Sequence, residues 1–158
     1  RGGGRGLLAG QNSADITDKG TIIVFDNGLL GRRTGRGACR SIHESIYWRE
    51  PFSCVVEIDP KKIGEESIVR VFSPGPHVAA KAIFYTSTNG SVQALPGGNI
   101  LVSAGNKGRI FEIDGLTGRV VWDYASPFGL QLEEWPGVVV NPVFSSYRYP
   151  KGYTPFLK

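Results

Sequence analysis

The sequence predicts an all-β protein that forms part of a β-propeller and is too short to close the ring on its own. Three observations support this prediction. Glycine and proline contribute 22 and 10 of the 158 residues, a content that favours short strands and tight turns over long helices. Four short apolar strands form a unit, and the unit occurs twice. A propeller needs about four to eight four-stranded blades, so two units and one terminal strand supply only part of one.

The first predicted unit has four strands with a long loop between the second and the third. Its strands are SADIT (13–17), TIIVFDNG (21–28), SCVVEIDPKK (53–62) and SIVRVFSP (67–74). The second strand ends on Asp26, Asn27 and Gly28, residues that favour a turn because glycine tolerates positive φ and aspartate caps its own backbone. A rim of an active site is the alternative interpretation of this turn.

The second predicted unit repeats the order of the first without the long loop. Its strands are GSVQAL (90–95), NILVSAGN (99–106), GRIFEIDGLTG (108–118) and RVVWDYASP (119–127). The second strands begin 78 residues apart, at residues 21 and 99, whereas Ile58 and Ile113 of the third strands are 55 apart. The loop 29–51 accounts for the difference. One blade cannot bury both of its faces alone, so the two units should stack.

These patterns divide the chain into five parts. They are a Gly/Arg-rich leader (1–9), a first blade (10–74) with the inserted Arg-rich loop (29–51), an inter-blade connection (75–89), a second blade (90–127) and a C-terminal part (128–158). The C-terminal part consists of a connection and the closing strand PVFSSYRYP (142–150). The chain starts at Arg1, so we expect a processed form or a fragment of a longer protein. A β-sandwich would show similar strands but would leave the repeated Glu-Ile-Asp motif unexplained.

The positive charge is modest and concentrated in one loop. Lys and Arg number 18 against 14 Asp and Glu, a net charge of +4. Within the loop 29–51, Arg32, Arg33, Arg36 and Arg40 follow one another with no acid between them. Guanidinium groups match sulfate or phosphate oxygens, and a solvated loop is the alternative. A single RGGGRG segment without aromatic residues does not favour nucleic-acid binding.

The two cysteines, Cys39 and Cys54, leave two alternatives open. A disulfide between them would close a loop of about 15 residues and stabilise the fold by roughly 3 kcal/mol, which would imply an oxidising compartment. A free, buried Cys54 on a strand is the other. Two cysteines do not make a metal site, and Asp59 and Asp114 recur in both units, which indicates structural turns rather than calcium ligands. No apolar run approaches the roughly 18 residues of a membrane helix.

Several motifs together resemble the arylsulfotransferase family. They are TIIVFDNG, FSCVVEIDP, VQALPGGNILVSAGNKGRIFEID, GRVVWDY and VFSSYRYP, which cover most of the chain between residues 10 and 150. The resemblance implies a six-bladed propeller that moves a sulfuryl group between phenolic compounds without a cofactor, of which this chain would be the C-terminal portion. It also implies a secreted, periplasmic or organelle-lumenal protein, a phenolic sulfate ligand, and partners that are either the remaining blades or another subunit.

The resemblance implies a histidine nucleophile, and the chain departs from the family at that position. Asn12 stands where the histidine is expected; its amide can hydrogen-bond an oxyanion but cannot act as a nucleophile. The family's arginine has counterparts in Arg32, Arg33 and Arg36, so these residues, with Asn12 and Asn27, are the anion-binding candidates. His77 is the candidate for a catalytic role, although a loop histidine is more often solvated or structural, as is expected of His43.

Two functions therefore remain open from the sequence. One is an arylsulfotransferase-like enzyme portion, degenerate at the catalytic histidine. The other is a non-catalytic propeller relative that serves as a structural or binding subunit, because an open blade face exposes apolar surface that favours a partner. Trp122 is expected to pack between blades. Trp135, Tyr147 and Tyr149 are expected in core and interface packing, with an aromatic pocket for a phenol as the alternative.

Overall fold

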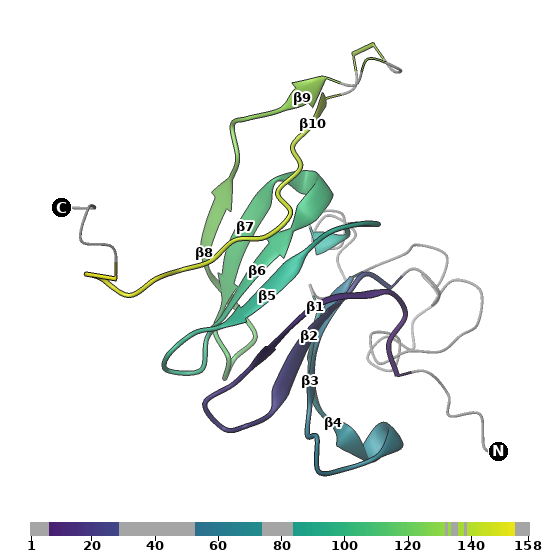
Figure 1. Ribbon diagram of the computed structural model, residues 1–158, viewed down its shortest axis with the longest axis vertical. Coiled ribbons are helices and arrows are strands. Elements are labelled where there is room, and N and C mark those ends of the chain that lie inside the picture. The colour runs from purple at the N-terminus through teal and green to yellow at the C-terminus, as the bar shows by residue number, and fades with distance from the viewer. Residues whose placement is uncertain are drawn as a thin grey trace.

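The described part of the chain is all-β, as predicted. The computed structural model describes residues 7–28, 53–73, 84–131, 133, 136–137 and 139–153. Their strands form three antiparallel sheets, none of them closed. Two sheets have four strands each, in the orders β1-β2-β3-β4 and β5-β6-β7-β8, and the third pairs β9 with β10. Each large sheet is thus a meander of consecutive strands (Figure 1).

The eight strands of the two large sheets overlap the eight predicted segments. They are β1 (Gln11–Ile16), β2 (Ile22–Asp26), β3 (Cys54–Ile58), β4 (Ile68–Phe72), β5 (Ser91–Ala94), β6 (Ile100–Ala104), β7 (Arg109–Ile113) and β8 (Val120–Ala125). Two 3-10 helices, η2 (Gly64–Ser67) and η3 (Gly105–Lys107), join β3 to β4 and β6 to β7. Turn residues and alternating apolar residues therefore located these strands correctly.

The two large sheets share one hydrophobic core. In β6, Ile100, Val102 and Ala104 point into it, because alternate residues of a strand face opposite sides of the sheet. The remaining buried members are Ile23, Phe25, Val55, Phe72, Phe84, Val92, Phe111 and Ile113. Both sheets contribute to this cluster, so neither buries its apolar face alone.

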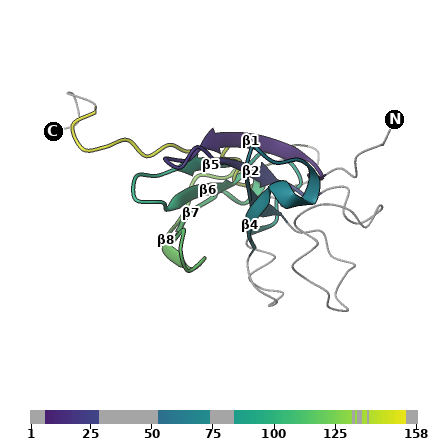
Figure 2. The ribbon, with the colours of Figure 1, turned by 90° about the horizontal axis from the view of Figure 1, so that it is seen from below.

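The sheets lie closest along β1 and β5 and diverge toward β4 and β8 (Figures 1 and 2). Phe84, which precedes β5, fills part of the space between them. Its ring stacks on Phe25 with the centroids 6.2 Å apart, and it lies 5.1 Å from Phe111 in a tilted arrangement. Aromatic rings at these separations add attraction beyond the area they bury. Phe84 therefore joins one sheet to the other.

Side chains of β1 bond the free edge of β5. The Val92 amide donates to Ser13 Oγ at 3.3 Å, and the Ala94 amide donates to Asp15 Oδ2 at 2.9 Å. These N–H groups point away from β6, the neighbour of β5 in its own sheet. Buried backbone donors need partners, and here polar side chains of the neighbouring sheet supply them.

The same bonding recurs between β5 and the C-terminal segment 143–149. The Ser146 amide donates to Ser91 Oγ at 3.3 Å, and the Arg148 amide donates to Gln93 Oε1 at 2.7 Å. Ser91 and Gln93 lie 78 residues after Ser13 and Asp15, the spacing of the predicted repeat. The segment 143–149 thus lies against β5 as β5 lies against β1.

The C-terminal region differs from the prediction in two respects. A short hairpin of β9 (Leu130–Gln131) and β10 (Val139–Val140) occupies the region expected to be a plain connection. The predicted closing strand, residues 142–150, belongs to none of the three sheets. The described hydrogen bonds between this segment and β5 involve side chains, so no backbone ladder forms between them.

The predicted turns are confirmed. The Gly28 amide donates to Asp26 Oδ1 at 3.0 Å, and Gly28 has a φ of 69°. After β3, the Lys61 amide donates to Asp59 Oδ1 at 3.0 Å. After β7, the amides of Leu116 and Thr117 donate to Asp114 Oδ1 at 3.0 and 2.6 Å. All three aspartates cap their own turns.

Candidate functional site

The predicted site residues that the structure describes do not converge. Asn12 is exposed on β1, whereas Asn27 follows β2 and is only 3% exposed. The Asn27 side-chain nitrogen donates to the carbonyl oxygens of Thr86 and Asn89, both at 2.8 Å. Both amide hydrogens are therefore engaged, and an anion at Asn27 would have to displace one of these bonds.

The other predicted site residues lie outside the described part of the chain. They are Arg32, Arg33, Arg36, Cys39 and His77, together with Arg40, His43 and Trp135. Cys54 is described: it is fully buried on β3 and its sulfur is in a disulfide. The pairing of Cys39 with Cys54 stays a prediction.

Hydrogen bonds to the Asp26 carboxylate hold the end of β2, next to Asn27. The carboxylate is fully buried and accepts bonds from the amides of Ala9 at 2.9 Å and Gly28 at 3.0 Å. Burial raises the pKa of Asp26, and the two amide donors partly oppose that rise. Ser53 adds a link to the chain before β5, since its Oγ accepts from the Thr86 amide at 3.1 Å. These contacts hold the chain where β2 leaves the core.

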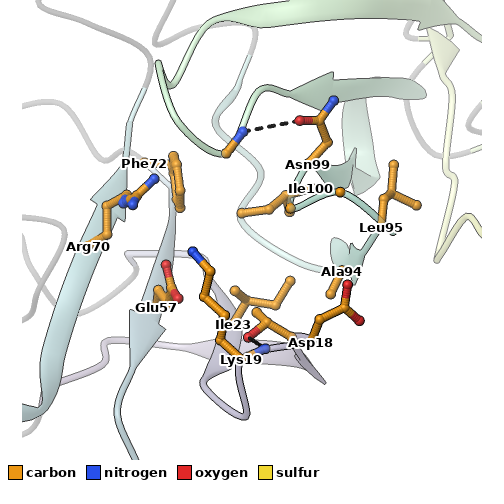
Figure 3. Close-up of a pocket in the computed structure, with 14 residues that line it drawn as sticks. Asp18, Lys19, Ile23, Glu57, Arg70, Phe72, Ala94, Leu95, Asn99 and Ile100 are labelled. Carbon is orange, nitrogen blue, oxygen red and sulfur yellow. Dashed lines mark hydrogen bonds between the residues drawn. The ribbon is translucent and has the colours of Figure 1, made fainter.

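A cavity of about 180 Å³ lies between the two large sheets, next to the β1–β2 and β5–β6 turns (Figure 3). Its apolar wall includes Ile23, Phe72 and Ile100, and glycines of the two turns in the second sheet border it. Its charged residues are Asp18, Lys19, Glu57 and Arg70. The two acids and two bases balance in charge. Sequence reasoning did not identify this site; the repeated position of the glutamate in Glu-Ile-Asp was the available signal.

Glu57 is the buried charged group of this cavity. It is 9% exposed, and its Oε1 accepts a bond from Thr21 Oγ1 at 2.6 Å. Arg70 stands opposite Glu57 in the β3–β4 register, and its guanidinium carbon lies 5.3 Å from the centroid of the Phe72 ring. Figure 3 shows Glu57, Arg70 and Lys19 on one side of the cavity. Within the described residues, no carboxylate lies within 4.0 Å of the Lys19 or Arg70 nitrogens.

A second charged cluster occupies the corresponding place in the second sheet. Asn99 Nδ2 donates to Glu112 Oε1 at 2.6 Å, and Arg148 Nη1 donates to Glu112 Oε2. The guanidinium carbon of Arg148 lies 5.3 Å from the Trp122 ring centroid. The bond from Asn99 and then the charge and bond of Arg148 lower the pKa of Glu112, against its desolvation. In this cluster the Arg148 guanidinium binds Glu112, whereas the cavity lies at the corresponding place beside Glu57.

Trp122 and Tyr124 lie on an open face, whereas Tyr149 borders a second cavity of about 260 Å³ that Glu112 and Arg148 also line. Trp122 and Tyr124 stack with their centroids 6.3 Å apart, and they are 43% and 42% exposed. Trp122 pairs with Glu112, on the opposite side of the sheet from core residue Phe111. The prediction that Trp122 packs between blades is therefore wrong for the two described sheets, because the strand register turns its side chain away from the first. Tyr147 and Tyr149 are likewise exposed, not in core packing.

The described residues contain neither a metal-binding cluster nor a membrane-spanning helix. No group of three or more His, Cys, Asp or Glu side chains in this part of the chain is placed to hold a metal ion. None of the helices described there is long and apolar enough to cross a membrane. In comparisons with known proteins, no family model, no curated protein and no solved structure matches the chain.

Proposed function

We propose that the chain is the C-terminal portion of an arylsulfotransferase-like β-propeller, supplying two blades and the inner strand of a third. The observation that carries the proposal is the repeated bonding of inner strands. The side chains of Ser13 and Asp15 accept bonds from β5. Those of Ser91 and Gln93, 78 residues further along the chain, accept equivalent bonds from the segment 143–149. Identical contacts at successive positions are what rotation about one axis would produce. The divergence of the sheets away from β1 and β5 fits the same arrangement (Figure 1).

In this proposal the described part of the chain is scaffold and lacks the nucleophile, while the arginine candidates for anion binding lie outside it. Sulfuryl transfer through a histidine would form an N–S bond while the S–O bond to the phenolic leaving group breaks. Asn12 is exposed on β1 at the place where the family resemblance expects that histidine. An amide can donate a hydrogen bond to a sulfuryl oxygen but cannot form the N–S bond. The expected activity of this portion is therefore binding of an aryl sulfate without turnover.

Replacing Asn12 by histidine tests this proposal directly. We expect the natural chain to bind para-nitrophenyl sulfate without releasing nitrophenol. Asn12→His should release nitrophenol in a burst and acquire one sulfuryl group, detected by intact mass. Asn12→Gln is the matched control, because it keeps an amide and supplies no nucleophile. If neither the natural chain nor Asn12→His binds the aryl sulfate, the family proposal fails. If the natural chain turns over and His77→Ala abolishes the rate, the assigned loss of the nucleophile is wrong.

A non-catalytic binding subunit is the second candidate function, and the open face of the second sheet favours it. Trp122 and Tyr124 are about two-fifths exposed there, and the Trp122 ring lies beside the guanidinium of Arg148 in the segment 143–149. Such a surface is typical of an interface. In native mass spectrometry of the protein from its source, this function predicts a stoichiometric complex with a second polypeptide and no sulfuryl transfer. A lone, uncomplexed polypeptide would contradict it.

A further inference from the structure

The two glutamates of the repeated Glu-Ile-Asp motif occupy equivalent places in the two sheets. Glu57 lies on β3 and Glu112 on β7, and each is 9% exposed. Each accepts a 2.6 Å bond at Oε1 from the residue that precedes the second strand of its sheet, Thr21 or Asn99. The repeat therefore provides an internal comparison for everything else around these two carboxylates.

The second carboxylate oxygens, Oε2 of Glu57 and Oε2 of Glu112, differ in their hydrogen-bond partners. Glu112 Oε2 accepts a bond from the guanidinium of Arg148. Within the described part of the chain, no group donates to Glu57 Oε2. That oxygen is not sealed inside the protein either, because no buried side-chain oxygen or nitrogen there lacks a partner. Glu57 Oε2 therefore borders the open space of the cavity, to which Glu57 contributes a wall.

Ala94 stands in the first repeat where Arg148 stands in the second. The Ala94 amide bonds Asp15 on the preceding inner strand, just as the Arg148 amide bonds Gln93. A methyl group thus replaces a long cationic side chain, and Figure 3 shows Ala94 and Glu57 on opposite sides of the cavity. The cavity of about 180 Å³ is the space that an arginine side chain would cross. A cationic N–H donor from a ligand can take the place of the missing guanidinium.

The same side of the cavity holds two cations that have no carboxylate partner among the described residues. Lys19 and Arg70 lie on the same side of the cavity as Glu57 in Figure 3. No described carboxylate forms an ion pair with either. A ligand carboxylate would satisfy both, since Arg and Lys donate strong charge-assisted bonds to carboxylates. Asp18 also lines the cavity, so the charges of Asp18, Glu57, Lys19 and Arg70 around the space sum to zero.

We propose that this inter-sheet cavity binds a small zwitterion of the free α-amino acid type. Its ammonium group donates to Glu57 Oε2, its carboxylate accepts from Lys19 and Arg70, and an apolar side chain lies against Ile23 and Ile100. An α-amino acid carries both charged groups on one carbon, which matches the clustering of the three protein charges. The volume of about 180 Å³ is below that of pockets for drug-sized ligands, roughly 300–1,000 Å³. This site is independent of the proposed sulfuryl transfer.

Isothermal titration calorimetry with L-leucine tests the proposal. Isoamylamine and isocaproate are the matched probes, because each keeps the apolar chain and one of the two charged groups. We expect L-leucine to bind at least tenfold more tightly than either probe, since each loses a charge-assisted contact. No detectable binding of L-leucine, or equal binding of either single-charge probe, would overturn the proposal.

Three variants and one control variant assign the binding to this cavity. Glu57→Gln should weaken L-leucine binding at least tenfold, whereas Glu112→Gln, the same change in the second repeat, should leave the affinity within about twofold. Ala94→Arg should fill the space and abolish binding while the circular dichroism spectrum stays unchanged. Lys19→Gln, on an exposed turn, should weaken binding without affecting folding. Equal effects of Glu57→Gln and Glu112→Gln, or full binding by Ala94→Arg, would place the amino acid elsewhere and refute the site.

Discussion

Asn12 and Asn27 come from one stretch of sequence and have opposite surroundings. Asn12 is exposed on β1, and no described residue accepts or donates a side-chain hydrogen bond with it. Asn27 is buried, and its amide ties the end of β2 to the carbonyls of Thr86 and Asn89. The two residue types are identical, so their environments alone decide what each contributes to stability.

Asn27→Ala should therefore destabilise the protein far more than Asn12→Ala. Truncation removes two donors and leaves the Thr86 and Asn89 carbonyls without them, which costs about 1–3 kcal/mol in the free energy of unfolding. Asn12→Ala, at an exposed position, should stay within about 0.5 kcal/mol. Urea denaturation of both variants measures the difference. Equal losses would show that the Asn27 side chain does not stabilise the end of β2.

Glu112 predicts how stability depends on acid pH. Its pKa is lowered from the ordinary 4.5, first by the bond from Asn99 and then by Arg148. A carboxyl whose pKa is lower in the folded state stabilises the fold above its unfolded value and loses that contribution as the pH falls through the folded value. Stability should therefore drop below about pH 4.5, and Glu112→Gln should flatten that part of the curve. Thermal melts between pH 2 and pH 6 compare the two proteins, and parallel curves would contradict the assignment.

At the scale of single elements, the edge of β5 depends on side chains of β1. Asp15 Oδ2 accepts the Ala94 amide at 2.9 Å. In Asp15→Ala this amide loses its partner, so its hydrogen exchange should accelerate about tenfold for each 1.4 kcal/mol of lost protection. Asp18→Ala, in the exposed turn that follows β1, is the matched control and should leave the Ala94 amide unchanged. If Asp15→Ala leaves that exchange rate unaltered, the side chain does not protect the strand edge.

The β7–β8 turn depends on a close approach of two backbone segments. Gly115 contacts the carbonyl of Gly98 so closely that an added Cβ would collide with that oxygen. Backbone cannot move aside as a flexible side chain can, so Gly115→Ala should cost about 1–3 kcal/mol of stability. Leu116→Ala, at the neighbouring exposed position, should be nearly neutral. Guanidinium melts of the two variants test this order, and a neutral Gly115→Ala would contradict the contact.

At the scale of the whole molecule, the shared core predicts that both large sheets unfold together. Phe111 on β7 packs with Phe84, which also stacks on Phe25 of β2. Phe111→Ala should lower the free energy of unfolding by about 3–5 kcal/mol. The loss should appear equally in the slowest-exchanging amides of β2 and β6, followed by native-state hydrogen exchange. Faster exchange confined to β5–β8 would mean that the sheets are separate cooperative units.

Much of the fold could be predicted because strands depend on local pattern. The alternation along Ile100–Ala104 and the turn residues after Asp26 act over a few positions, so a single sequence shows them. The β9–β10 hairpin was missed because its strands have two residues each, too few for an alternation to be visible. The side of the sheet on which Trp122 lies was also missed, since it depends on the register with β7.

The candidate site could not be predicted from local sequence patterns. The motif Glu-Ile-Asp placed Glu57 and Glu112 in equivalent strands, but the motif is the same in both repeats. Their difference comes from residues distant in sequence: Ala94 lines the same cavity as Glu57, and Arg148 is bonded to Glu112. A missing side chain creates a cavity only when the surrounding elements are in place, and only the packed sheets reveal which residues surround it.

The sequence by itself determined that the described part of this protein is all-β and holds two four-strand units, and it located their strands and aspartate turns. These features follow from backbone preferences and side-chain alternation, which act between near neighbours. The tertiary structure alone decided that Asn27 ties β2 to the chain before β5, that Trp122 lies on an open face, and that Glu57 borders a cavity while Glu112 holds an arginine. Each of these depends on how the two sheets pack, and packing is a relation between distant parts of the chain.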